Sequence, residues 1–169
     1  MALDRDDPLE QRVVAALAAT GADFEVLECD PAFADTAAFC ERYGIDPAIS
    51  ANAIVVASKK EPKQFAACLV LATTRLDVNG TVRRRLGVNK ASFATADETS
   101  DLTGMVIGGV TPFALPPDLP IWVDARVMDQ PKVVVGGGTR SMKVLVVTDA
   151  FTKLDMAEIV EDLAKPSVS

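Results

Sequence analysis

Two glycine-rich segments are the parts of this sequence best suited to hold a ligand through backbone groups. Residues 108–112 read Gly-Gly-Val-Thr-Pro, and residues 136–141 read Gly-Gly-Gly-Thr-Arg-Ser. Each segment follows an apolar run, and glycine lets the backbone adopt a positive φ and approach a bound group closely. Adjacent N–H groups in such loops can converge on an anion or on a developing oxyanion. The second segment also fits a plain hairpin connection, so spacing alone leaves both interpretations open.

The residue types that are missing narrow the chemistry further. The chain has no histidine, which excludes Ser-His-Asp and Cys-His nucleophilic systems and any histidine general base. Neither glycine segment fits a Walker A loop or the dinucleotide fingerprint. Cys29, Cys40 and Cys68 form no close-spaced pair, which disfavours a zinc site or a disulfide framework. We therefore expect three buried free thiols, no metal and no cofactor. An enzyme of this sequence would have to use lysine, carboxylates, backbone N–H groups or groups of its substrate.

Charge and length limit the partners and the location of the chain. The 17 Lys and Arg residues against 24 Asp and Glu residues give a net charge of −7, which opposes a broad nucleic-acid surface. Two local basic clusters, residues 83–85 with Lys90 and residues 59–63, could meet phosphates or simply be solvated surface. No run approaches the about 20 apolar residues needed to span a bilayer. The acidic first residues lack the features of a signal peptide, so we expect a cytoplasmic protein.

The apolar pattern predicts helices and strands that alternate irregularly within one domain. The expected strands cover residues 24–29, 53–57, 65–71, 121–123, 133–135 and 144–147. The expected helices run from Pro8 to Gly21, from Asp35 to Gly44, from Asn79 to Gly87 and from Asp97 to Gly104, and a final one capped by Asp155 carries Ile159, Val160 and Leu163. Because several strands follow one another directly, the order favours an α+β fold with a mixed or antiparallel sheet. We expect one domain over residues 1–169, with its core at about 22–164 and frayed ends in the first few residues and in 165–169.

The segment around the first glycine pair resembles a known family. Residues 103–113, TGMVIGGVTPF, look like the G-x-x-x-G-G-x-[ST]-P signature of the YbaK/EbsC family. The flanking order is also similar: a basic helix that ends at Leu86-Gly87, residues 90–94, an acidic helix start at Asp97-Glu98, and then residues 121–124 and 135–138. The resemblance covers nearly everything from Phe24 to Leu163.

The resemblance implies both a fold and an activity. Members have a strongly curved, largely antiparallel, barrel-like sheet surrounded by helices, and they are similar to the editing domain of bacterial prolyl-tRNA synthetase. Their pocket receives the 3′ end of a mischarged tRNA and hydrolyses the aminoacyl ester. The implied function is therefore a trans-editing aminoacyl-tRNA deacylase without a cofactor, with a synthetase such as prolyl-tRNA synthetase as a possible partner.

The resemblance also assigns site residues. The backbone of Gly108 and Gly109 would face the ester carbonyl. The pocket would further be formed by Thr111, Pro112, Gly136, Gly137 and Asp124. Well-studied members carry a pocket lysine just before the strand that we expect at residues 53–57, whereas this sequence has Asn52 there. Asparagine can donate a hydrogen bond but brings no charge, so we expect Asn52 to orient the ester and consider Lys90 as a substitute cation.

Three functions remain open at this point. The first is the deacylase. The second is a binding module that has lost hydrolysis and holds an aminoacyl-tRNA 3′ end or a small ligand in the same pocket. The third is a regulatory or protein-interaction role of the apolar loop at residues 113–120.

Overall fold

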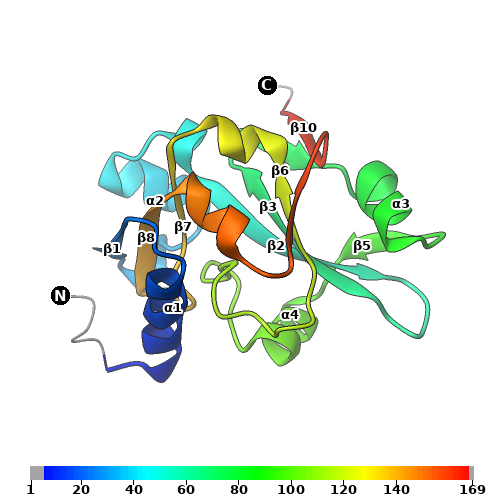
Figure 1. Cartoon of the computed structure of the whole chain (residues 1–169), viewed down its shortest axis with the longest axis horizontal. Coiled ribbons are helices and arrows are strands. Elements are labelled where there is room, and N and C mark those ends of the chain that lie inside the picture. Colours follow the sequence, from blue (N-terminus) through cyan, green and yellow to red (C-terminus); the bar gives the residue numbers. More distant parts are fainter. Residues whose placement is uncertain (1–5, 168–169) are drawn as a thin grey trace.

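The computed structural model describes residues 6–167 and contains three open β-sheets with helices around them (Figure 1). The strands are β1 (Phe24–Glu28), β2 (Ala51–Ser58), β3 (Phe65–Leu71), β4 (Thr74–Leu76), β5 (Ala91–Phe93), β6 (Ile121–Asp124), β7 (Lys132–Gly136), β8 (Met142–Val147), β9 (Ala157–Val160) and β10 (Ala164–Pro166). The helices are α1 (Pro8–Ala19), α2 (Thr36–Tyr43), α3 (Arg83–Leu86) and α4 (Ala96–Thr103), and short helical turns occupy Pro31–Phe33, Pro47–Ile49, Val78–Val82, Ala125–Asp129 and Thr148–Lys153.

The sheet topology confirms the predicted α+β fold, although no barrel closes among the described residues. The largest sheet has the order β5-β2-β3-β6-β9, a second sheet has the order β1-β8-β7, and β10 pairs with β4. All strand pairs are antiparallel except β3 with β6 and β6 with β9. No helix in this part of the chain is long and apolar enough to cross a membrane.

The first helix begins where the sequence predicts and adds to the core. Asp7 caps it by accepting hydrogen bonds from the N–H groups of Leu9 and Glu10, and Pro8 occupies the first turn. An acceptor at this position satisfies N–H groups that have no partner within the helix. Val13 and Leu17 are fully buried in the main hydrophobic cluster. The core therefore extends N-terminal to the expected start near residue 22.

Two further helices confirm the predicted segments. Helix α2 begins after Asp35 and ends at Gly44, whose φ of 68° is left-handed and suits glycine. Helix α4 ends at Gly104, but its cap is Thr95 rather than the predicted Asp97. The Thr95 hydroxyl accepts from the Glu98 N–H, and the Glu98 carboxylate accepts from the Thr95 N–H, which is the capping-box arrangement.

The predicted C-terminal helix is wrong. Residues 157–160 form β9, which pairs parallel with β6, and Ala164–Pro166 form β10, which pairs with β4. Strand β6 is buried along its whole length, so its backbone groups on the edge away from β3 need partners that a helix could not supply. Lys165, which we expected to be frayed, lies in β10. Residues 1–5, 168 and 169, also expected to fray, lie outside the described part.

The two larger sheets touch at one point and then separate. Ser50, just before β2, forms a single parallel bridge with Val134 of β7. Among the described residues no further pairing joins β2 and β7, which belong to different sheets. The three cysteines are buried and free, as predicted.

Candidate active site

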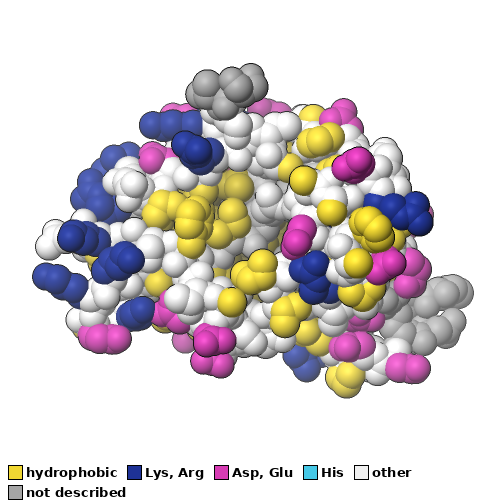
Figure 2. Space-filling model, turned by 180° about the vertical axis from the view of Figure 1, so that it is seen from behind, with side chains coloured by type: hydrophobic (Ala, Val, Ile, Leu, Met, Phe, Trp, Pro, Cys, Tyr) yellow, Lys and Arg dark blue, Asp and Glu magenta, His cyan; other side chains and the backbone are white. Residues whose placement is uncertain are grey.

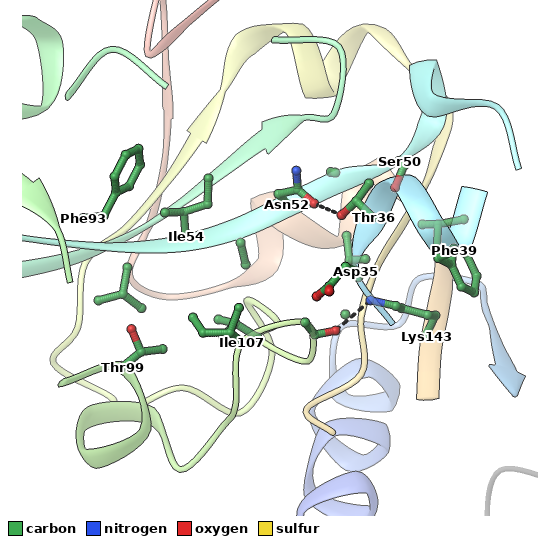
Figure 3. A pocket seen from close by; sticks show the side chains of 18 of the residues that line it. Asp35, Thr36, Phe39, Ser50, Asn52, Ile54, Phe93, Thr99, Ile107 and Lys143 are labelled. Carbon is green, nitrogen blue, oxygen red and sulfur yellow. Dashed lines mark hydrogen bonds between the residues drawn. The ribbon is translucent and has the colours of Figure 1, made fainter. Parts of the chain in front are cut away.

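A cavity of about 370 Å³ occupies the space where the two sheets separate, a size typical of small-molecule sites. Its walls come from β2, from β7, from the start of α2 and from the loop at residues 107–110 (Figure 3). Its lining residues include Asp35, Thr36, Phe39, Ser50, Asn52, Ile54, Phe93, Thr99, Ile107, Gly108, Gly136 and Lys143. The site is thus built from segments more than a hundred residues apart in the chain.

One wall of the cavity is an unpaired strand edge. Strand β2 pairs with β3 along its length, but with β5 only from Val56 onward. The Ser50 C=O accepts from the Ala72 N–H, and the Ser58 N–H donates to the Gln64 C=O. These two bonds show that the backbone groups of the even-numbered residues of this segment point toward β3. By antiparallel alternation, the N–H and C=O of Ala53 then point to the opposite edge. Within residues 6–167 no strand covers this edge at Ala53, so a backbone donor and acceptor face the cavity.

Asn52 lies on the same strand, and the start of α2 holds its side chain. Its Oδ1 accepts a hydrogen bond from the Thr36 hydroxyl. The amide nitrogen is the part of Asn52 that stays available to donate, and in Figure 3 it points away from Thr36. Asn52 is therefore a lining residue whose side chain is held in one orientation.

The glycine loop at residues 107–110 forms the opposite wall. Gly108 has a φ of +90°, and a Cβ there would lie 2.3 Å from the Arg140 guanidinium, so this position requires glycine. The N–H of Gly109 donates to the Val106 carbonyl at 2.8 Å, and the Gly109 carbonyl accepts from Gly138 N–H at 2.6 Å. Because its N–H is already used, Gly109 cannot donate to an ester carbonyl as we expected.

The second glycine segment supports the first instead of facing it across the cavity. Residues 136–141 connect the antiparallel strands β7 and β8, which is the plain hairpin connection that the sequence left open. A Cβ at Gly136 would lie 2.3 Å from the Val110 carbonyl oxygen, so the two backbones are in direct contact. Gly136 still lines the cavity, whereas Gly137 packs against the Met142 backbone.

Arg140 fixes the glycine loop to the start of α2. Its guanidinium donates to the Ile107 carbonyl at 2.9 Å and forms an ion pair with Asp35 at 3.0 Å. It also donates to the Pro31 carbonyl. Three segments that surround the cavity are thereby held by one side chain.

Lys143 is a lining residue that sequence reasoning missed. It extends from β8, is only 6% exposed, and donates from Nζ to the Gly108 carbonyl at 2.7 Å. Burial lowers its pKa; Cys29, Asp35 and Cys40 oppose this shift, while Arg140 reinforces it. The available signal was a lysine beside the apolar run 144–147, but only the fold shows that it reaches the first glycine loop.

Four other predicted residues lie outside the cavity lining: Lys90, Thr111, Pro112 and Asp124. Lys90 is exposed, and its carbonyl accepts from Lys59 N–H, so it cannot replace a pocket cation. Thr111 and Pro112 are buried beside the loop.

Asp124 is fully buried, accepts from Ala164 N–H at 3.3 Å and lies 3.7 Å from Arg126. Burial raises the pKa of its carboxyl group, and its contacts hold the C-terminal strand rather than the pocket.

Comparison with known proteins gives one consistent result. The family model of the aminoacyl-tRNA editing domain matches residues 30–154. The chain is 26% identical over 151 residues to the multifunctional Ser/Thr-tRNA deacylase ProXp-y of Escherichia coli (strain K12), covering 89% of this chain and 90% of the relative. The crystal structure of a candidate trans-editing enzyme for prolyl tRNA synthetase superposes with a TM-score of 0.79 at 25% identity, over 96% of this chain and 100% of that one.

A further solved structure supports the fold alone. It is a hypothetical protein with a TM-score of 0.80 at 23% identity, covering 91% of this chain and 99% of its own. The predicted family is confirmed, and with it the predicted class of activity, the editing of aminoacyl-tRNA. The chain belongs to the aminoacyl-tRNA editing domain family.

Proposed function

We propose that this chain is a trans-editing deacylase that hydrolyses the ester of a mischarged tRNA in the cytoplasm. The observation that carries the proposal is that Asn52, on the open edge of β2, and the Gly108 loop face the same cavity. An ester lying between them would meet the donors of β2, namely the Asn52 amide and the Ala53 N–H, on one side and the Gly108 loop with Lys143 on the other. In such a site the loss of one donor to the oxyanion costs about 10²–10³ in rate.

The surface beside the cavity suits the 3′ end of a tRNA. Phe93 and Ile107 line the cavity and are 56% and 53% exposed, so they present apolar surface on which an unpaired base can stack. The contact between Lys59 and Lys90 joins the two basic clusters of the sequence. Figure 2 shows Lys and Arg side chains gathered at the end formed by α3 and the β2–β3 turn, beside a hollow flanked by hydrophobic side chains.

This basic surface is local on a chain of net charge −7. Because the affinity that comes from phosphate contacts grows with their number, few contacts give weak binding. We therefore include in the proposal that tRNA is delivered or held by a synthetase, such as prolyl-tRNA synthetase, which is named for one of the similar structures.

The cavity favours a small amino acid with a hydroxyl group. Thr36, Ser50 and Thr99 contribute hydroxyl-bearing side chains to its lining, and Ser50 and Thr99 are 4% and 2% exposed. A site built to hydrogen-bond a substrate hydroxyl discriminates strongly against analogues that lack it. The similar E. coli protein is a Ser/Thr-tRNA deacylase, so seryl and threonyl esters are the first substrates to test.

The test is release of amino acid from a panel of purified tRNAs: Ser- and Thr-tRNA, together with Ala-tRNA(Pro) and Cys-tRNA(Pro). Asn52→Ala should slow release without lowering the melting temperature, and Asn89→Ala, at an exposed position outside the cavity, should behave as wild type. No release from any tRNA, together with measurable ligand binding, would refute hydrolysis and leave the binding module.

A further inference from the structure

The ammonium group of Lys143 is an unusual component of this cavity. It is almost completely buried, and removal from water disfavours a charged group unless other interactions compensate. The Gly108 carbonyl accepts one of its hydrogens, and the ring of Phe39 lies 5.6 Å from Nζ. An ammonium group has three donors, so two of them remain for a bound molecule.

No carboxylate neutralises this charge directly. Within residues 6–167 no Asp or Glu oxygen lies within 4.0 Å of Nζ. Asp35 also lines the cavity, but its carboxylate already pairs with Arg140 at 3.0 Å. The charges of Lys143, Arg140 and Asp35 together leave one uncompensated positive charge at the wall that includes Gly108. A low-dielectric site with such a charge attracts oxygen atoms that carry or develop negative charge.

The position of Lys143 indicates which oxygen atom of the substrate its ammonium group would contact. Its Nζ lies beside the Gly108 loop, in Figure 3 below the strand that carries Asn52. The exposed basic residues that could meet phosphates lie elsewhere, at the end formed by α3 and the β2–β3 turn. A buried cation inside the cavity is therefore placed for the acyl group, and the adjacent Gly109 N–H is unavailable for this task.

We propose that Lys143 is a catalytic residue that donates a hydrogen bond to the ester carbonyl oxygen as this oxygen becomes an oxyanion. The role rests on the proposed deacylase function. Water adds to the carbonyl carbon, and the bond from this carbon to the ribose oxygen breaks. The ribose oxygen takes one proton of the water, and the other proton leaves to solvent as the released acid ionises to its carboxylate. Lys143 stays protonated throughout and then contacts the carboxylate of the released amino acid.

The first test compares three variants in the same deacylation assay. Lys143→Met removes the charge while keeping most of the volume, and with the charge it removes the cost of burying an ammonium group that has no carboxylate partner. It should lower kcat by about 10²–10³ and change KM little. Lys143→Arg should retain more activity than Lys143→Met. Lys132→Met, at an exposed lysine of the neighbouring strand β7, should match wild type. A wild-type kcat in folded Lys143→Met would overturn the proposal.

The second test separates a direct contact from mere support of the glycine loop, and it does not require hydrolysis. NMR titration measures the binding of L-serine and L-threonine against that of their carboxamides, in which an uncharged amide replaces the carboxylate. Wild type should prefer the carboxylates, and Lys143→Met should lose this preference. A reduced kcat with an intact carboxylate preference would make Lys143 a support of Gly108 only, which contradicts the proposal.

The two tests also distinguish this inference from the proposed function. If wild type hydrolyses no tRNA of the panel but shows a carboxylate preference that depends on Lys143, the deacylase function fails and the anion-binding role of Lys143 stands. If wild type shows neither hydrolysis nor preference, both fail.

Discussion

The contact between the two glycine segments makes a quantitative prediction for Gly136→Ala. The new Cβ would lie 2.3 Å from the Val110 carbonyl oxygen and 3.0 Å from the Gly109 backbone, whereas ordinary contact begins at 3.4 Å. The loop must therefore move by about 1 Å, because its backbone, unlike a flexible side chain, cannot rotate away. A misplacement of about 1 Å near a reacting group can cost about 10²-fold in rate. Overpacking of this kind typically costs about 1–3 kcal/mol of stability.

We expect Gly136→Ala to lower kcat/KM for the preferred tRNA by about 100-fold at a temperature where the variant is still folded. Chemical denaturation measures the accompanying loss of stability. Gly44→Ala is the matched control, because Gly44 has a φ of +68° with nothing within 4 Å of its Cβ position. It should cost about 1–2 kcal/mol of stability from the left-handed conformation and leave kcat/KM unchanged. Wild-type activity in Gly136→Ala, or an equal loss of activity in both variants, would refute the reasoning.

Three further predictions concern Lys143, Asp124 and the basic surface that includes Lys59 and Lys90. Burial lowers the pKa of Lys143, so activity that depends on the ammonium form should fall as the pH rises through this lowered value, and in Lys143→Arg the fall should move to higher pH. The raised pKa of Asp124 means that folding favours its protonated form. In urea unfolding from pH 4 to 7, the wild type should therefore lose stability relative to Asp124→Asn as the pH rises. Deacylation by Asp124→Asn should stay unchanged. Replacing both Lys59 and Lys90 by Ala should weaken tRNA binding and reduce its dependence on salt, whereas the kcat of bound substrate should stay the same; an unchanged salt dependence would place the tRNA elsewhere.

The Asn52 position shows how a site can be recognised in part from sequence. The strand that carries it is a continuous apolar run, so its existence and its approximate bounds were predictable. The resemblance identified the residue before that strand as part of the pocket. Its partner Thr36 is sixteen positions earlier on a helix, and no local pattern connects the two.

Lys143, the buried cation of the cavity, could not be recognised from the sequence. The resemblance implies a pocket lysine near Asn52, and the candidate in the sequence is Lys90, which is exposed and lies outside the cavity. The structure places Lys143 there instead, from a strand of the other sheet. The spacing of Asn52 and Lys143 along the chain does not indicate that both line one cavity, because their distance in space is set by how the two sheets pack.

The sequence by itself determined the family, the α+β class and most helices and strands, since these depend on local signals. First-turn prolines such as Pro8, left-handed glycines such as Gly44 and apolar runs act over a few residues. Only the tertiary structure decided the C-terminal strands, the use of Gly109 as a structural contact and the identity of the buried lysine. Residues 157–160 became a strand because the buried edge of β6 required backbone partners. Gly109 donates its N–H to the Val106 carbonyl within the turn of the loop. Lys143 reaches Gly108 because this loop packs against the β7–β8 hairpin at Gly136, the residue that pairs with Lys143.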